Sequence, residues 1–320
     1  MAEASDRRGI KRRGIFGSGV VDRYFRSTTF LLALIVPALI LVLAIVLGWN
    51  SSGAWFRFNW SFLTSSTWDP SNQEFHILFA IYGTVVSSFL ALLIAVPLSL
   101  GAAISLSELA PRWLREPASF FIELLAAVPS IVYGLWGVFV LAPLLRPVEA
   151  WLGSHFPWIP LFSGSPRGID MFAAGIILAI MILPYITSVS RDVIQAVPAT
   201  QREAALALGA TQWEAIRGPV FRYARSGIIG AIILGLGRAL GETMAVTMVI
   251  GNMPNISASL FSPAYTMPSL LANQFNEASG MQLSALTLVA LVLVVITIII
   301  NIIARLLIWS VSKGETRGAC

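Results

Sequence analysis

Long apolar stretches dominate the pattern of hydrophobic and polar positions along this chain. A helix that crosses ~30 Å of hydrocarbon needs about 20 apolar residues. Six stretches reach this length, and they cover residues 27–49, 76–106, 118–142, 169–190, 227–250 and 283–309. No alternating strand pattern of the kind found in membrane barrels competes with them. The pattern therefore predicts an all-α polytopic membrane protein with six transmembrane helices.

The composition supports a membrane protein. Of the 320 residues, 57% are hydrophobic and only 12% are charged, and the mean hydropathy of +0.80 is far above that of soluble domains. A cleaved signal peptide is an alternative for the first stretch because a basic tail precedes it. The long apolar run and the lack of an A-x-A cleavage site favour a retained span. Cys320 is the single cysteine, which excludes an intrachain disulfide.

The basic residues predict the orientation of the spans. They gather in the N-terminal tail, after the second span, after the fourth span and at the C-terminal end, whereas the opposite loops contain only Arg57, Arg146 and Arg167. By the positive-inside rule, the N- and C-termini are both cytoplasmic. Membrane topology thus explains the sequence pI of about 9.8, and we expect membrane lipid rather than nucleic acid around this chain.

The expected organisation follows from these spans. Residues 1–26 form a basic cytoplasmic tail that ends in an interfacial helix near Val20–Arg26 or serves only as a solvated topology signal. Residues 27–75 form the first transmembrane helix and an outer loop, residues 76–310 the transmembrane core, and residues 311–320 a second cytoplasmic tail. The Pro-rich outer loops 143–168 and 251–281 are long enough for short surface elements, to which a partner protein would bind.

Two membrane segments are predicted to be interrupted at a proline. Pro129 in the third span frees a carbonyl that Ser130 or Tyr133 would satisfy, and Pro184 predicts a similar break in the fourth span. Two interpretations remain open. The breaks are kinks buried in protein, or they belong to a polar transport path.

The cytoplasmic segment Val197–Val220 predicts two short helices. Thr200 and Glu203 have the spacing of a capping box, and Gly209 provides a left-handed stop. A second box, Thr211 and Glu214, starts the next helix, which Gly218-Pro219 ends. Ala204, Ala205 and Leu208 form a small flat apolar face on the first helix. This face would bind in a groove of another protein, or the segment is an amphipathic connector on the bilayer.

Arg238 and Glu242 lie near the middle of the fifth apolar stretch. An ionised residue at this depth costs about 2.5–3.5 kcal/mol, so protein or water should shield it. On a continuous helix their i,i+4 spacing places them on one face, about 6 Å apart along the axis. They form an internal salt bridge, or Arg238 attracts an anion, since its planar guanidinium matches phosphate oxygens.

Glu242 needs its own explanation because a carboxylate repels an anion. One hypothesis is that it accepts a hydrogen bond from a protonated phosphate oxygen, which sulfate lacks. The rival hypothesis is that it only holds Arg238. Gly237 and Gly241 form a small-xxx-small pair that lets another helix approach beside the charges.

The sequence contains no readable enzyme motif. Lys11 and Lys313 are the only lysines, and neither precedes Ser or Thr, so a Walker A loop is absent. His76 and His155 belong to no metal-binding motif, and we expect no metal or cofactor on this chain. Energy for uphill transport must come from a separate subunit or from an ion gradient.

The motif "EAALALG", Glu203–Gly209, resembles the EAA loop of ABC-importer permeases. "AAVPSIVYGLWGVFVLAP", "ILPYITSVSRDVI" and "GIIGAIILGLGRALGETMAVTMVIGN" are similar to the phosphate-importing permeases of this family. The usual I-x-L-P end of the motif is replaced by Pro219-Val220-Phe221-Arg222. The resemblance implies an ABC type I importer permease fold in the bacterial inner membrane.

The same resemblance implies the partners. They are a homologous permease subunit, an ATPase dimer that uses ATP and Mg²⁺, and an external phosphate-binding protein. It assigns ATPase coupling to Glu203, Ala204, Ala205, Leu208 and Gly209, and the substrate pathway to Arg238 and Glu242. The alternatives are a permease for sulfate or another oxyanion and an ion-coupled secondary anion transporter.

Overall fold

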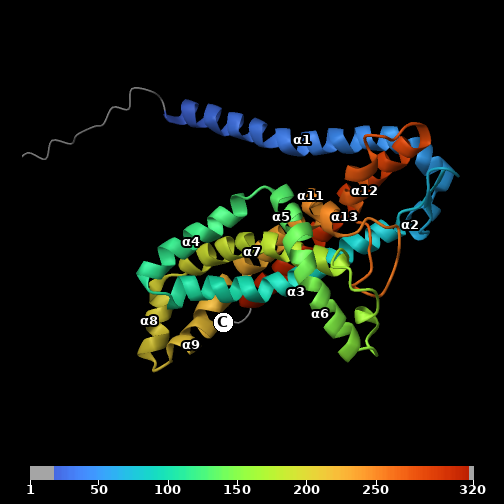
Figure 1. Cartoon of the computed structure of the whole chain (residues 1–320). Helices are drawn as coiled ribbons and strands as arrows, with labels where there is room; N and C mark the ends of the chain where they lie inside the picture. Colours follow the sequence, from blue (N-terminus) through green and yellow to red (C-terminus); the bar gives the residue numbers. More distant parts are fainter. Residues whose placement is uncertain (1–17, 317–320) are drawn as a thin grey trace, which may run out of the picture. The chain divides into compact units, whose positions relative to one another are not determined.

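The structure is a computed structural model that describes residues 18–316. Contacts divide the chain into residues 1–49 and residues 50–320. Within the described part, six helical segments are long and apolar enough to cross a membrane. They are Asp22–Phe58, Leu78–Leu109, Ser130–His155, Met171–Gln195, Gln212–Gly241 and Gly280–Leu306. The predicted helical membrane fold is confirmed (Figure 1).

The helices occur in the following order. They are α1 (Ser18–Phe58), α2 (Ser61–Thr64), α3 (Leu78–Ile104), α4 (Arg112–Ala127), α5 (Ser130–Trp136), α6 (Ala142–His155), α7 (Met171–Gln195), α8 (Ala199–Ala207), α9 (Gln212–Ala215), α10 (Phe221–Gly241), α11 (Met244–Val249), α12 (Met267–Gln274) and α13 (Gly280–Thr316). Some of these helices are joined by wider π-helical turns, η1 (Ser105–Leu109), η2 (Gly137–Leu141) and η4 (Ile216–Val220). The element η3 (Pro160–Phe162) is a 3₁₀ turn. Strand β1 (Trp68–Asp69) pairs antiparallel with β2 (Glu74–Phe75).

The core of residues 50–320 is the pair α3 and α7, which pack against each other more extensively than any other two elements. Small residues allow this approach. A Cβ on Gly175 of α7 would come within 2.4 Å of the side chain of Leu90 on α3. On the neighbouring contact, a Cβ on Gly235 of α10 would lie 2.7 Å from Ile186 of α7. Because lipid gives helices no hydrophobic reason to associate, close packing at such glycines stabilises the bundle.

Several predicted boundaries are wrong. The helix α1 is continuous from Ser18, so a separate interfacial helix near Val20–Arg26 is not formed; residues 1–17 lie outside the described part. The third spanning segment is Ser130–His155 rather than 118–142, since Pro129 separates it from α4, and helix α6 occupies half of the predicted outer loop 143–168.

Pro184 does not break α7. The helix runs unbroken from Met171 to Gln195, and next to the proline the Leu183 carbonyl accepts from the Ser99 hydroxyl of α3 at 3.1 Å. Pro129, in contrast, ends a helix. The carbonyl of Leu125, which Pro129 leaves without its helical donor, accepts from the hydroxyl of Tyr133 at 2.8 Å, as predicted for Tyr133.

The loops opposite α8 and α9 form a folded cap. Helix α12 was expected at the surface, but its first residues are buried, and the backbone N–H of Met267 donates to Thr84 of α3 at 2.9 Å. Gly83 is necessary here because a Cβ would lie 2.0 Å from the Tyr265 carbonyl oxygen. The indole of Trp68 on β1 donates to Gln274 of α12 at 2.9 Å.

Two buried acids fix the start of α7. Asp170 is 0% exposed and caps the helix, since its carboxylate accepts from the Ala173 N–H at 2.9 Å. Glu149 is 1% exposed and accepts from the Gly168 N–H at 3.0 Å. Burial, with the nearby Glu149 carboxyl group, raises the pKa of Asp170 to about 7. The loop before α7 is therefore attached through two buried carboxyl groups, and that of Asp170 favours protonation.

Candidate functional site

The first candidate site surrounds Arg238 near the end of α10. The helix ends at Gly241, and the backbone of Glu242 is extended, with ψ of 125°. The chain resumes as α11 at Met244. The prediction of one continuous fifth span, 227–250, is therefore wrong. The Thr243 hydroxyl donates to the Gly241 carbonyl at 3.2 Å, which satisfies one of the groups that the interruption exposes.

The predicted charge pair, Arg238 and Glu242, lies directly before this interruption. The Glu242 carboxylate accepts from the Ala245 N–H at 3.4 Å and so faces the start of α11. Among the described residues, no ion pair joins Arg238 to Glu242 or to any other acid. The predicted shared helix face stays a prediction, because the chain leaves the helical path only after Glu242, whose φ is −69°.

The guanidinium of Arg238 instead stacks on an aromatic ring. Its Cζ lies 4.2 Å from the centroid of Tyr185 on α7, a distance suited to a cation–π interaction. The Tyr185 hydroxyl donates at 3.1 Å to the carbonyl of Ala126, in the last turn of α4. Arg238 is thus linked through Tyr185 to the helix break at Pro129, which the sequence had indicated as a separate feature.

Hydrogen bonding leaves the Arg238 guanidinium incompletely satisfied by protein. Its Nε is buried and has no hydrogen-bond partner among the residues that the structure describes. A cation–π contact contributes about 0.5–2 kcal/mol, less than the cost of burying an unpaired charge. Arg238 therefore keeps donor capacity for a bound anion.

The predicted glycine pair lies beside this site. A Cβ on Gly237 or Gly241 would meet nothing within 4 Å in the part of the chain that the structure describes. Leu234, one turn earlier on α10, is 63% exposed. This side of α10 is therefore uncovered within the chain, as the approach of a further helix requires.

The second candidate site is the predicted coupling segment Val197–Val220. Its first capping box is wrong, because α8 begins at Ala199 after Pro198 and Thr200 lies inside the first turn. The glycine stop is confirmed. Gly209 has φ of +88°, and the N–H groups of Ala210 and Gly209 donate to Ala205 and Leu206 at 3.1 and 3.0 Å. These bonds form a Schellman motif.

The second capping box is confirmed. The Thr211 N–H donates to the Glu214 carboxylate at 2.8 Å, and the Glu214 N–H donates to the Thr211 hydroxyl at 3.3 Å. Gly218-Pro219 does not end the helix. Instead, the π-helical turn η4 continues directly into α10, so α9 is joined to the fifth span without a loop.

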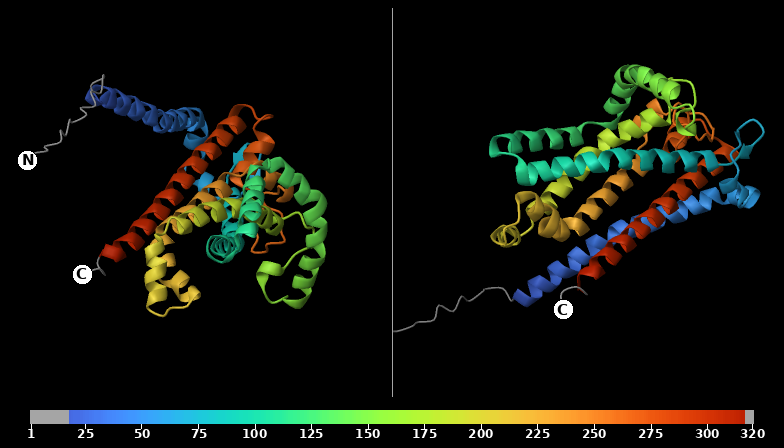
Figure 2. Two further views of the ribbon diagram at one scale, coloured as in Figure 1. Left: turned by 90° about the vertical axis from the view of Figure 1, so that its left-hand side faces the viewer. Right: turned by 90° about the horizontal axis from the view of Figure 1, so that it is seen from below.

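The coupling segment exposes apolar side chains. Leu208 is 90% and Leu206 46% exposed, and no residue of α8 is buried. Among the residues predicted for coupling, Glu203, Ala204, Leu208 and Gly209 are exposed and Ala205 is half-buried. Figure 2 shows α8 and α9 together beyond the packed helices. The structure thus places all five predicted residues on one projecting element.

Sequence reasoning missed Tyr185, Arg202 and Glu108. Tyr185 belongs to the stretch "ILPYITSVSRDVI", but its sequence separation from Arg238 hides their contact. Arg202 directly precedes the EAA motif, and its partner Glu108 is 94 residues away. Within the described residues, no group of three or more His, Cys, Asp or Glu is arranged to hold a metal.

Comparison with known proteins defines the class. Residues 95–313 match the family described as "Binding-protein-dependent transport system inner membrane component". The chain belongs to this family, and it is a multi-pass inner-membrane transport permease. At the level of fold it is similar to a chain in the crystal structure of a bacterial ABC transporter involved in alginate import, with a TM-score of 0.57, 15% identity and coverage of 91% of this chain and 98% of that one.

Comparison by sequence finds relatives of higher identity than this structural neighbour. The chain is 46% identical to the "Phosphate transport system permease protein PstC" of Pasteurella multocida, over 93% of this chain and 95% of the relative. It is 49% identical to the protein of the same name from Mesorhizobium japonicum, over 89% of each chain.

Proposed function

We propose that this chain is a transmembrane permease subunit of an ATP-driven importer of inorganic phosphate. The observation that carries the proposal is the 46–49% identity, over at least 89% of the chain, to permeases named for phosphate transport. The chain itself catalyses no covalent step. It provides part of the path for the anion and responds to a separate subunit that hydrolyses ATP.

The coupling segment is where that ATPase dimer would bind. Leu206, Leu208 and Trp213 project apolar surface, and Trp213 is 58% exposed. Gly209, with φ of +88°, lets the chain turn sharply between α8 and α9. In this proposal ATP and Mg²⁺ bind only to the partner ATPase, and its closure moves Glu203–Gly209 relative to the membrane.

Arg238 would guide the anion along the path. Its guanidinium carries donors suited to phosphate oxygens, and Tyr185 fixes its plane. The uncovered glycines Gly237 and Gly241 would face a homologous permease subunit, so the path would run between the two subunits. We place both chain ends in the cytoplasm because basic residues cluster on that side.

Glu242 would select among anions. Its carboxylate lies near the break after Gly241 and, among the residues that the structure describes, accepts one hydrogen bond, from the Ala245 N–H, which leaves acceptor capacity for a protonated phosphate oxygen. The folded loops opposite the coupling segment would bind an external phosphate-binding protein. Replacing Glu242 with Gln tests the selective role, since equal phosphate/sulfate discrimination by an intact Glu242→Gln complex contradicts it.

The direct test is phosphate uptake by proteoliposomes that contain the reconstituted complex. We expect uptake that requires ATP, resists dissipation of ion gradients and is little affected by excess sulfate. Uptake driven by an ion gradient without ATP would indicate a secondary transporter. ATP-dependent uptake of sulfate in preference to phosphate would agree with an ATP-driven permease but would contradict phosphate as its substrate.

A further inference from the structure

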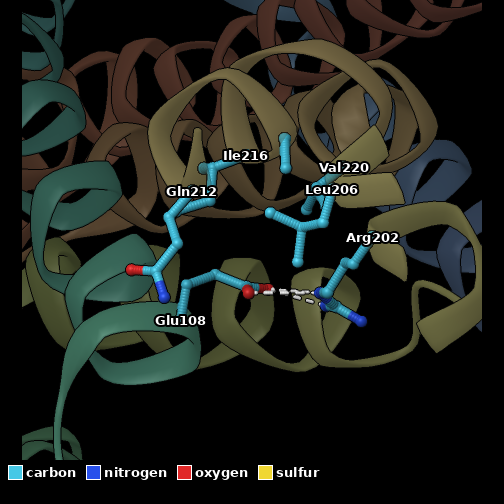
Figure 3. Close-up of a pocket in the computed structure, with 7 residues that line it drawn as sticks. Glu108, Arg202, Leu206, Gln212, Ile216 and Val220 are labelled. Carbon is cyan, nitrogen blue, oxygen red and sulfur yellow. Dashed lines mark hydrogen bonds and ion pairs between the residues drawn. The ribbon is translucent and has the colours of Figure 1, made fainter. Parts of the chain in front are cut away.

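Arg202 connects the coupling segment to the end of the second span. Its Nε donates to both carboxylate oxygens of Glu108, at 3.0 and 3.1 Å, and its Nη2 donates to Oε1 at 2.6 Å (Figure 3). Glu108 belongs to η1, which continues α3. This geometry presents the flat edge of the guanidinium to the carboxylate, so the contact fixes orientation as well as distance.

The same guanidinium also holds the end of the fourth span. Nη1 donates to the Val197 carbonyl at 2.8 Å, and Nη2 donates to the Ile194 carbonyl at 2.9 Å. Carbonyls at a helix C-terminus lack helical donors and carry partial negative charge, so a cation is favoured there. One side chain on α8 thus binds both α3 and α7, the two helices that form the packed core.

Packing alone does not fix α8. None of its residues is buried, and Leu206 borders a pocket that also involves Gln212 and Ile216. Figure 3 shows the Arg202–Glu108 pair on one side of this pocket. The side chains of Arg202 and Glu108 are only 24% and 12% exposed. Since water screens such a pair incompletely, it is stronger than an ordinary surface salt bridge.

We propose that Arg202 is a positioning residue that transmits movement of α8 to α3 and α7 during the ATP cycle. The inference rests on the proposed function, because it assigns the source of the movement to an ATPase. Without the bonds of Arg202, α8 would still move with the ATPase, but α3 and α7 would move less than α8. ATP would then be hydrolysed with less transport.

The test measures phosphate moved per ATP hydrolysed by the full complex in proteoliposomes. For Arg202→Gln and Glu108→Gln we expect this ratio to fall by about fivefold or more, with normal co-purification of the ATPase. Arg202→Lys should recover only part of the ratio, since an ammonium lacks the planar fork. The double variant Arg202→Glu/Glu108→Arg should move more phosphate per ATP than either single variant, Arg202→Glu or Glu108→Arg. Arg112→Gln, which removes an exposed arginine near Glu108, is the matched control.

A second readout needs no phosphate. Spin labels at Gln201 on α8 and Leu98 on α3, both exposed, report the distance between these helices in the full complex. We expect ATP to leave this distance unchanged in the parent chain and to change it in Arg202→Gln. An unchanged distance and an unchanged transport ratio in Arg202→Gln would overturn the inference. If the parent complex moves another anion but keeps α8 and α3 together, the phosphate proposal fails and the transmission inference stands.

Discussion

Arg202 and Arg238 show two ways of placing an arginine in a membrane permease. Arg202 directs its donors to one carboxylate and two helix-end carbonyls, at 2.6–3.1 Å. Arg238 has an aromatic ring at 4.2 Å and, among the described residues, no acid within ion-pair distance. A guanidinium whose three nitrogens all donate to protein holds elements together, whereas one with an unpartnered Nε keeps a donor unused. In the proposed function, this difference in partners assigns coupling to Arg202 and handling of the anion to Arg238.

Arg238 should show the largest effect on transport. Replacing it with Gln removes a charge-assisted donor set, and a hydrogen bond to a charged group contributes about 1.5–3 kcal/mol, so uptake should fall about tenfold to a hundredfold. The measurement is the initial rate of ATP-dependent phosphate uptake, with complex assembly checked by co-purification. Normal uptake by the assembled Arg238→Gln complex would remove this residue from the path.

Tyr185 tests whether the ring is needed to hold Arg238. Tyr185→Leu removes the cation–π contact of about 0.5–2 kcal/mol and should slow uptake about two- to thirtyfold. Tyr185→Phe keeps the ring and loses only the bond to the Ala126 carbonyl, so it should be milder. Equal defects in the two variants would assign the effect to the hydroxyl group. The two variants are compared by uptake assays at several phosphate concentrations.

Asp170 extends the contrast to buried acids, because its neighbour is another carboxyl group rather than a cation. Its folded pKa, raised to about 7, exceeds the ordinary value of 3.8. The folded state therefore binds more protons between these values, and stability should fall as pH rises from about 4 to 7, by about 1 kcal/mol or more. Thermal unfolding of detergent-purified complex should show this slope, and Asp170→Asn should reduce it. An unaltered slope in Asp170→Asn would assign the pH dependence elsewhere.

The two predicted capping boxes give the smallest expected effect. Thr211→Ala removes a formed cap, which typically contributes about 1 kcal/mol, and should loosen α9. Thr200→Ala should have little effect because the Thr200 hydroxyl forms no cap of α8. Hydrogen exchange of residues 199–220 in the complex measures both. Greater loosening by Thr200→Ala than by Thr211→Ala would contradict the observed helix start.

Local signals predicted local structure. The stop at Gly209 and the box at Thr211 depend on neighbours within a few residues, and both are confirmed. Proline shows where such reasoning fails. Pro129 follows the end of α4, whereas Pro184 lies inside the unbroken α7, whose partners, such as Ser99 of α3, are distant in sequence. Sequence patterns contain no information about those partners.

The candidate sites were predictable only in part. Arg238 was evident because a charge in an apolar stretch is costly, but its contact with the Tyr185 ring on another helix was not. The EAA resemblance located α8, whereas the Arg202–Glu108 bond joins positions 94 residues apart. Membrane spans followed from hydropathy, and their ends depended on tertiary packing.

One paired measurement tests the division between the two arginines most directly. Spin labels on the two permease subunits of the complex would record the ATP-driven change in their separation, and uptake would be measured in the same vesicles. We predict that Arg238→Gln retains the ATP-driven change and loses uptake, whereas Arg202→Gln reduces both. Loss of the change in Arg238→Gln, or a full change with normal uptake per ATP in Arg202→Gln, would contradict the account.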